Sequence, residues 1–241
     1  MGSFYYDMHL HSCLSPCADN DNTPNNIAGM ASLCGLDIIA LTDHNSCKNC
    51  PAFFTAADRY GLIPIAGMEL TTSEDIHVVC LFEELEGALS FDAALEGLRL
   101  PMKNRPDIFG EQLVVDGEDN VIGTEEALLS FATSLSLEDV PDMVSRFGGI
   151  CYPAHIDRPA NGVISVLGTF PKTPYFSCVE LHSPEKVEEY RGMEILKDKH
   201  FVVSSDAHYL TDIRDKANSF ELDCGRENGA LVRKMLFEYL R

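Results

Sequence analysis

Two short motifs place possible metal ligands two residues apart. His9-Leu10-His11 ends an apolar run at residues 5–10, and Asp206-Ala207-His208 follows the apolar run Phe201-Val202-Val203. Side chains at positions i and i+2 of a strand point to the same side, so each pair could chelate one ion. One such pair is weak evidence, because packed or solvated histidines are common. Two pairs in the same setting favour a metal site.

Further candidate ligands also stand at the ends of apolar runs. His44 follows residues 37–41, Glu69 follows 63–68 and His155 follows 149–154, whereas His77 lies near the start of 76–82. The carboxyl ends of parallel strands converge on one face of a barrel. Six of the eight histidines fall at such places, which predicts one shared metal centre. Imidazole and carboxylate together suit Zn, Mn or Fe better than Mg or Ca.

Apolar runs and helical patterns alternate along the chain. The helices are expected from Pro24, with Thr23 as N-cap, to Cys34 before Gly35, and over 51–60 and 228–240. Strands are expected at 5–10, 37–41, 63–68, 76–82, 149–154, 177–181 and 201–205. This order predicts an α/β fold with a mainly parallel sheet in one domain, residues 1–241. The length of 241 residues is near the roughly 250 of a (β/α) barrel.

Residues 83–148 break this alternation. Helical patterns are found at 88–98, 124–134 and 137–147, and the apolar segments 113–115 and 121–122 flank the turn residues 116–120. The latter pattern predicts a β-hairpin. We interpret the whole segment as an insertion on the barrel that forms a lid.

The motifs together resemble the PHP (polymerase and histidinol phosphatase) family, in its motif order and over nearly the whole chain. They are Asp7-Met8-His9-Leu10-His11-Ser12, Thr42-Asp43-His44, Glu69, His77, Pro153-Ala154-His155 and Ser205-Asp206-Ala207-His208. The resemblance implies a distorted barrel of seven βα units, a site of two or three divalent ions and metal-dependent hydrolysis of a phosphoester. In such a site a hydroxide that bridges the metals attacks the phosphate.

The resemblance also implies which residues hold each ion. His9, His11, Glu69 and Asp206 would hold the first, and Glu69 would bridge to a second that His77 and His155 complete. A third would take His44, His208 and an acidic residue of the loop after His11, for which we prefer Asp19 to Asp21 because of its spacing from Pro24. Glu69 and Asp206 would thereby act in catalysis, and Asp43 would orient a ligand.

Arg158 is the first candidate for substrate binding and catalysis, because its guanidinium matches phosphate oxygens and follows His155 by three residues. Asn45 and Lys48, after His44, are weaker candidates. His182 and His200 are expected to have no role in the site.

Nine cysteines, an odd number, and an N-terminus without the pattern of a signal peptide favour a cytoplasmic protein, and no apolar run is long enough to span a membrane. Cys13, Cys17, Cys47 and Cys50 lie on loops of the same expected face. They could bind zinc or an iron–sulfur cluster, but four reduced thiols are the favoured interpretation.

The net charge of −20 excludes a long basic track for nucleic acid, although a short groove could hold a few nucleotides. The leading hypothesis is therefore a phosphoesterase for a small phosphorylated metabolite or nucleotide. Histidinol-phosphate phosphatase and 5′-end exonuclease activity on short oligonucleotides are alternatives. An amidohydrolase that cleaves C–N bonds and a non-catalytic module are alternatives of other classes, and the oligomeric state stays open.

Overall fold

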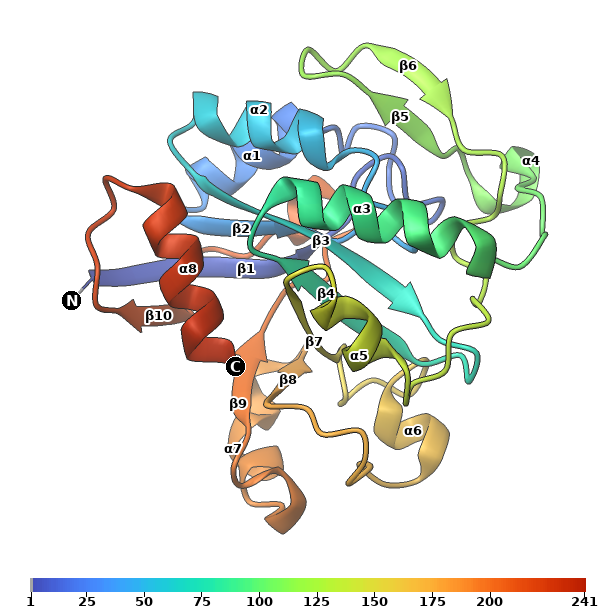
Figure 1. The fold of residues 1–241 in the computed structure, drawn as a ribbon. Coiled ribbons are helices and arrows are strands. Elements are labelled where there is room, and N and C mark those ends of the chain that lie inside the picture. The colour runs from blue at the N-terminus through green and yellow to red at the C-terminus, as the bar shows by residue number, and fades with distance from the viewer. Residues whose placement is uncertain (1) are drawn as a thin grey trace.

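A computed structural model describes residues 2–241. Its main sheet has six strands in the order β10–β1–β2–β3–β4–β7, and it curls around the centre of the molecule (Figure 1). These strands are β1 (Gly2–Leu10), β2 (Ile38–Leu41), β3 (Ile63–Thr71), β4 (His77–Phe82), β7 (Gly149–Pro153) and β10 (Ser219–Leu222). The fold is thus of the α/β class and contains a curved, partly closed sheet.

Two further strands continue around the same centre. β8 (Cys178–Leu181) and β9 (His200–Val203) form a separate parallel pair that lies beside β7. An isolated parallel bridge joins Leu10, at the end of β1, to Ala207, after β9. The carboxyl ends of β1 and β9 therefore meet, although ladder hydrogen bonds do not continue through β8 and β9 into one sheet.

The expected parallel sheet is only partly observed. β1, β2 and β3 are parallel, but β4 runs antiparallel to both β3 and β7, and β10 runs antiparallel to β1. The connection between β3 and β4 is short, so the chain returns as a hairpin rather than through a crossover helix. Because β4 is reversed, its first residue, His77, lies at the same end of the sheet as the last residues of β3.

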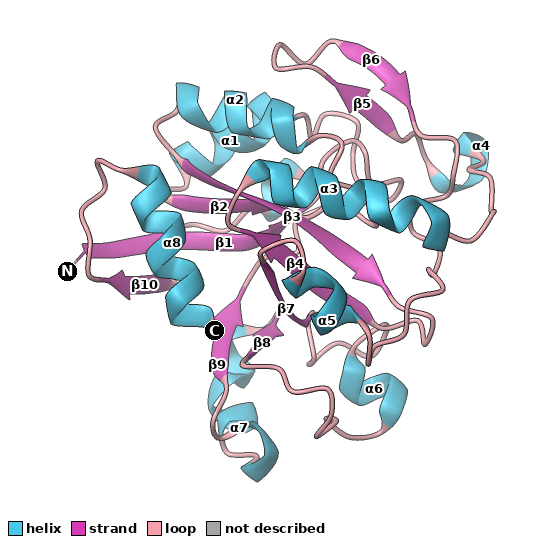
Figure 2. Cartoon of the chain, in the orientation of Figure 1, coloured by secondary structure: helices cyan, strands magenta, loops and turns pink. Residues whose placement is uncertain are grey.

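Helices cover the sheet, as Figure 2 shows by element type. α1 (Pro24–Leu33) begins after Thr23, whose side chain accepts from the Asn26 amide, and α2 (Cys50–Arg59) ends before Gly61. Both boundaries agree with the sequence predictions. α8 (Gly229–Leu240) packs its buried Val232, Leu236, Phe237 and Leu240 against one face of the strands. The remaining helices are α3 (Leu85–Leu95), α4 (Pro106–Phe109), α5 (Val140–Ser145), α6 (Val163–Leu167) and α7 (Val187–Arg191), with short 3₁₀ turns at Glu96–Leu98, Pro184–Lys186, Glu194–Leu196 and Leu210–Asp212.

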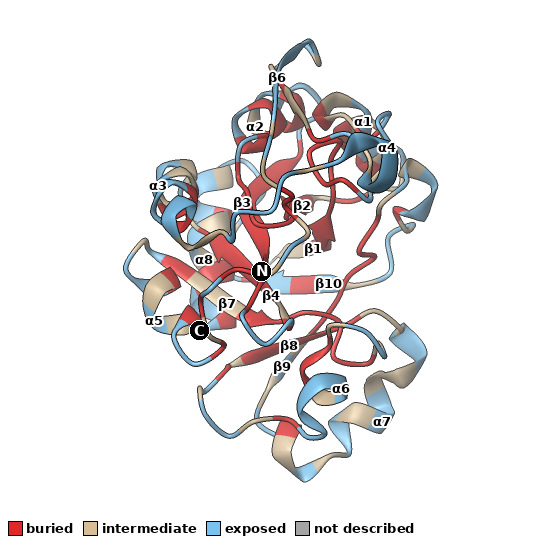
Figure 3. Cartoon of the chain, turned by 90° about the vertical axis from the view of Figure 1, so that its right-hand side faces the viewer, coloured by how far each residue is buried: buried red, intermediate tan, exposed pale blue. Residues whose placement is uncertain are grey.

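Two large apolar clusters on opposite faces of the strands make up most of the core, and a small third one joins Cys13, Ala52 and Val115. Phe4, Tyr6 and Met8 of β1 pack in the cluster with α8, whereas Leu10 packs in the other cluster with α1, α2 and α3. A register shift between Asp7 and Leu10 interrupts the alternation of β1. Burial is densest along the strands, and α6 and α7 lie at the exposed lower side of Figure 3.

The segment 83–148 has two parts. α3 buries Ala88, Phe91 and Leu95 in the core, and β5 (Leu113–Val115) with β6 (Val121–Thr124) forms the predicted hairpin. The predicted helix at 124–134 is wrong, because this stretch bonds across to other segments, including Leu128 N–H to Met102 and Thr133 N–H to Thr71. The predicted helix at 137–147 is shorter in the structure, where it is α5. No helix within residues 2–241 is long and apolar enough to cross a membrane.

Candidate metal centre

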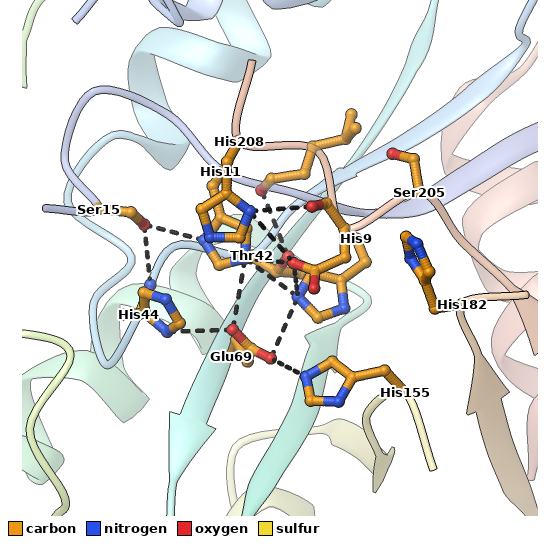
Figure 4. Close-up of polar contacts among 12 residues, drawn as sticks. His9, His11, Ser15, Thr42, His44, Glu69, His155, His182, Ser205 and His208 are labelled. Atoms are coloured by element: carbon orange, nitrogen blue, oxygen red, sulfur yellow. Dashed lines mark hydrogen bonds and ion pairs between the residues drawn. The ribbon is translucent and has the colours of Figure 1, made fainter. Parts of the chain in front are cut away.

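The carboxylate of Glu69, on β3, lies at the centre of a group of imidazoles (Figure 4). Its Oε1 is 2.8 Å from His77 Nδ1, 3.0 Å from His155 Nε2 and 3.3 Å from His9 Nε2. Its Oε2 is 3.0 Å from His44 Nδ1 and 3.3 Å from His11 Nε2. One buried carboxylate thus contacts five histidines, two at the end of β1 and the others at the ends of three further strands, which is the arrangement of a bridging ligand.

Asp206 adds a second buried carboxylate to the same group. Its Oδ1 lies 3.1 Å from His11 Nε2, 3.3 Å from His9 Nε2 and 3.6 Å from His208 Nδ1. Its Oδ2 accepts a hydrogen bond from Arg158 Nη1. Asp206 therefore joins the histidine group on one side to a guanidinium on the other.

Among residues 2–241, three groups of ligand atoms lie close enough together to hold an ion. They are His9, His11, Glu69 and Asp206; then His44, Glu69 and His77; and His11, His44 and His208. The first group is the set expected for the first ion. In the second, His44 takes the place expected for His155, which still contacts the shared Glu69 oxygen. The third contains His44 and His208 as expected, and His11 in addition.

The donor atoms fit divalent ions. Metal–ligand bonds of roughly 2.0–2.2 Å place neighbouring ligand atoms about 3–3.5 Å apart, which is the spacing around Glu69 and Asp206. Glu69 Oε2, His44 Nδ1 and His155 Nδ1 are buried and lack a well-aligned hydrogen bond in the structure. Buried polar atoms are rarely left unpaired in proteins, so these atoms are suited to binding a metal ion.

The charges of the centre are strongly coupled. Burial opposes protonation of His9, but Glu180, Asp206 and Glu69 outweigh it and raise its pKa well above the usual value. The pKa values of His11 and His44 are also raised, against burial, by nearby acidic groups that include Glu69. Burial opposes ionisation of Glu69, yet His77, His9 and His44 hold its pKa well below the usual range. Bound cations would replace the protons of these imidazoles.

A second layer of polar groups fixes the ligands. Ser15 Oγ lies 2.9 Å from His11 Nδ1, accepts from the His44 amide at 3.1 Å and donates to Asp43 Oδ1 at 2.7 Å. Asp43 thus orients His11, which it reaches through Ser15, and not the imidazole of His44, its neighbour in the sequence. Glu180, on β8, lies 2.9 Å from His9 Nδ1 and accepts from the His155 amide at 3.0 Å. Such partners set the tautomer and orientation of ligating histidines.

Two ligands sit on strained backbone. His155 has φ +27° and Asp206 has φ +52°, in the left-handed region that residues other than glycine seldom adopt. Both lie within three residues of the end of a strand, His155 after β7 and Asp206 after β9. Strain of this kind clusters at functional sites, since the surrounding structure must hold it in place.

Comparison with known proteins agrees with this geometry. The family model of the PHP domain matches residues 7–129, just over half of the chain, and this stretch contains the candidate ligands from His9 to His77. The chain belongs to the PHP family. Among curated proteins, no sequence matches this chain.

Three solved structures of low sequence identity have a fold similar to that of this chain. Endonuclease Q of Pyrococcus furiosus, which is lesion-specific, has a TM-score of 0.65 at 16% identity over 97% of this chain, but the match spans only 55% of the endonuclease. A protein of Bifidobacterium adolescentis assigned as a metal-dependent phosphoesterase has a TM-score of 0.57 at 20% identity, with 96% and 95% of the two chains covered. An amidohydrolase of Chromobacterium violaceum has a TM-score of 0.58 at 18% identity, with 90% and 91% covered.

The loop after the first PHP motif does not bring Asp19 to the metal centre. The Asp19 side chain is exposed, and its Oδ1 accepts from the Asp21 amide in a local turn. Cys17 of the same loop instead contacts His44 and His208 with its thiol. Although loss of water opposes ionisation, these two imidazoles lower the pKa of Cys17 to about 5. The third ligand group thus has the thiol of Cys17 beside it, in the place expected for the carboxylate of Asp19.

Two expected substrate contacts have other partners. The side-chain Nδ2 of Asn45 donates to the Leu129 and Phe131 carbonyls, and its Oδ1 accepts from the backbone amide of Thr71. Both polar atoms of this side chain are therefore used to hold the chain. Lys48 pairs with Glu125. Neither residue lines the cavity of about 160 Å³ over the metal ligands, whereas Arg158 does. The interpretation of Asn45 and Lys48 as substrate-binding residues is therefore not supported by their positions.

The structure brings in residues that the sequence did not indicate. His182, expected to lie outside the site, contacts Arg158, and Arg214 contacts His182 from the other side. Glu180 is the other omission. A lone acid or arginine far from any motif carries no local signal, although Glu180 inside an apolar strand of 177–181 could have been noticed as a buried charge. His200 is exposed beside Tyr239, away from the centre.

The four loop cysteines are dispersed. Cys13 lies by Leu113, Cys17 by His44, and Cys47 and Cys50 by the Gly67 carbonyl. None of the three ligand groups among residues 2–241 includes a cysteine, and all four are free thiols. The favoured interpretation of reduced thiols agrees with this arrangement, and a four-cysteine cluster does not.

Proposed function

We propose that this PHP protein is a metal-dependent phosphoesterase that hydrolyses a phosphate ester of a small metabolite or nucleotide. The observation that carries the proposal is Asp206, whose one oxygen faces His9 and His11 while the other accepts from Arg158. An ester phosphate seated there would meet cations on one side and a guanidinium fork on the other. That is the environment a phosphoryl group requires as negative charge develops on it.

The residues around Glu69 would hold two to three ions of Zn, Mn or Fe. His9, His11, Glu69 and Asp206 would form one site, and His44, Glu69 and His77 another, with His155 near the bridge. His44, His208 and His11 would hold a third, which Asp19 could join only if its loop moved. Bound ions would supply Lewis acidity toward the phosphate and lower the pKa of a coordinated water. Arg158 would bind and orient the phosphate oxygens.

The segment after α3 is proposed to form the rim of the site rather than an independent unit of the single domain. The Leu113 amide donates to the Cys13 carbonyl, and the Leu129 and Phe131 carbonyls are held by Asn45. The segment is therefore fastened to both loops that follow the first two metal-binding strands. Movement of residues 100–135 would change the access of substrate to the ligands.

A small substrate is preferred to a long nucleic acid. Endonuclease Q has been solved with a 27-mer DNA duplex, but this chain spans about half of that protein. The net charge of −20 opposes a long phosphate backbone, and the cationic groups beside the metals are local. Histidinol phosphate and the 5′ end of a short oligonucleotide remain candidate substrates within the same chemistry. All nine cysteines are free thiols, which suits the reducing cytoplasm that we propose as its location.

Cleavage of C–N bonds is the second candidate, because one structural neighbour is described as an amidohydrolase. Enzymes of that class commonly use a lysine to bridge two metals. Here Glu69 lies where the bridging ligand is proposed, and none of the described residues that line the cavity over these ligands is a lysine. The donor set thus favours the phosphoesterase.

The test is turnover after loading with Mn, Zn or Fe in turn. We expect hydrolysis of 4-nitrophenyl phosphate or bis(4-nitrophenyl) phosphate, and none of 4-nitroacetanilide or a lactone. Asp206→Asn should abolish the activity without unfolding the protein, as judged by circular dichroism. Hydrolysis of the anilide alone would refute the proposal. So would full activity of the Asp206→Asn variant.

A further inference from the structure

A second cavity adjoins the metal centre. Its volume is about 340 Å³, and it is lined by Arg158, His182, Ser205, Asp206, Asp212 and Arg214. It shares Arg158 and Asp206 with the cavity over the metal ligands. The paired side chains of Arg158 and Asp206 thus lie between the two cavities, and a molecule whose phosphate lies at the metals would have to extend past Arg158 to reach this space. In Figure 4, His182 stands apart from the imidazoles around Glu69, on the side where Ser205, also of this lining, is labelled.

Two guanidinium groups converge on the one imidazole of His182. Arg158 Nη2 lies 3.1 Å from its Nδ1, and Arg214 Nη2 lies 3.2 Å from its Nε2. Arg214 Nη1 also donates to the His182 carbonyl at 2.7 Å. A neutral imidazole has only one acceptor nitrogen, whereas the two guanidinium groups present ten N–H groups between them. Most of these donors lack a partner in this cluster, so the cavity wall is rich in free donors.

Arg214 is a half-buried cation without an acidic partner. Within residues 2–241 it forms no ion pair with a carboxylate, although the chain carries 38 acidic residues. Arg158 does have such a partner, but this is Asp206, whose other oxygen belongs to the metal ligands. Loss of hydration without a counter-charge is costly for a guanidinium unless a ligand supplies the charge.

The backbone at His182 is held in place by Asp157. Its amide donates to Asp157 Oδ1 at 2.8 Å, and the next amide, that of Ser183, donates to Asp157 Oδ2 at 3.0 Å. Burial together with the positive charges of Arg158 and Arg214 lowers the pKa of His182, which keeps its ring neutral between the two cations. The ring thus contacts both guanidinium groups, and all three residues line the cavity.

We propose that Arg214, together with Arg158 and His182, forms a subsite for a second oxyanion of the substrate. This oxyanion would be a phosphate or a carboxylate, and little more than the width of the Arg158 guanidinium would separate it from the ester phosphate. This inference rests on the proposed function and narrows it to esters that carry two anionic groups. Arg158 would lie between the two anions, and Arg214 would contact only the second. Esters whose phosphate is their only anionic group would leave the Arg214 charge unpaired.

The experiment measures binding of three phosphonates that are not hydrolysed, by calorimetry on the metal-loaded protein. Ethylphosphonate has one anionic group, 3-phosphonopropionate adds a carboxylate, and 1,2-ethylenebisphosphonate adds a second phosphonate at the same spacing. We expect at least one of the two-headed probes to bind the wild type about ten- to a hundredfold more tightly than ethylphosphonate, as a charge-assisted contact allows. The probe that gains identifies the second group as carboxylate or phosphate.

Arg214→Gln should remove this gain and leave the affinity for ethylphosphonate within about twofold. Arg233→Gln is the matched control, because Arg233 is also half-buried and donates to a backbone carbonyl, that of Glu83, but lies on α8. It should retain the gain. If Arg214→Gln does not fold, Arg214→Lys keeps the charge without the fork and should retain only part of the gain.

Equal binding of all three probes by the wild type would overturn the inference, as would an equal loss for all probes in the Arg214 variant. A wild type that favours a two-headed probe but hydrolyses no phosphate ester would leave the subsite standing and refute the proposed function instead.

Discussion

Replacement of Glu180 by glutamine tests how the second layer controls the metal centre. Glu180 is 1% exposed and holds two ligands from different strands, His9 through its Nδ1 and His155 through its amide. Glutamine keeps an acceptor oxygen and nearly the same shape, and it removes only the charge. The variant therefore isolates the electrostatic part of the contact.

The magnitude follows from these contacts. A hydrogen bond to a charged group contributes about 1.5–3 kcal/mol and a neutral one about 0.5–1.5 kcal/mol, so the exchange should cost about 1–1.5 kcal/mol. This corresponds to a loss of roughly five- to tenfold in affinity for the ion that His9 holds. Glu180→Ala removes the acceptor as well and should cost about a hundredfold, the upper end for second-layer changes at metal sites.

Competition with a chromophoric zinc chelator at neutral pH measures these affinities. Glu221→Gln, an exposed change on β10, is the matched control and should have no effect. Because Glu180 is the leading charge that raises the pKa of His9, the same variant should lower that pKa in the metal-free protein, as read by NMR titration. Unchanged zinc affinity together with an unchanged His9 titration would refute the reasoning.

Four further outcomes are expected. Cys17→Ser should reduce the metal content by up to one ion per chain in elemental analysis, whereas Asp19→Ala should not, and the reverse result would restore the aspartate as the ligand. Arg158→Ala should lower kcat/KM about ten- to a hundredfold at unchanged metal content, and an unaffected rate would exclude a phosphate contact. Asn45→Ala should lower the free energy of unfolding by about 3 kcal/mol in urea titrations, since three buried hydrogen bonds are lost, and a loss below about 1 kcal/mol would contradict that role. His9, His11 and His44, whose pKa values are raised, should stabilise the metal-free protein fully below about pH 6.5. This stabilisation should disappear as the pH rises through the pKa values that they have in the folded protein. A melting temperature that does not decline in this way between pH 5 and 9 would contradict the charge assignment.

Much of the metal centre could be predicted because short-range patterns in the sequence mark its residues. Strand ends followed by His or Asp, such as those before His44 and Asp206, are visible as short apolar runs with a polar stop. The helix limits at Thr23 and Gly61 were equally local, since they depend on a cap and on a positive φ. These features need no knowledge of which strands pair.

The remainder depends on contacts between distant segments. The reversal of β4 is a matter of pairing, and an apolar run does not reveal its direction. The failed helix at 124–134 has helical spacing, yet its backbone bonds to residues near 71, 98 and 102. Arg214 and Glu180 act on His182 and His9 across 32 and 171 residues, so no motif could join them.

The pairing of the sheet has a consequence for dissecting the protein. The stretch 7–129 carries the family signature and five of the candidate metal ligands, but β1 is paired by β10, and β4 by β7, both outside it. A fragment cut at residue 129 would present two bare strand edges, which template aggregation. During synthesis, the same half-chain emerges with a partial set of ligands before its edges can be covered. Coexpression of complementary halves, rather than expression of the half that matches the family model alone, is therefore the way to divide this fold.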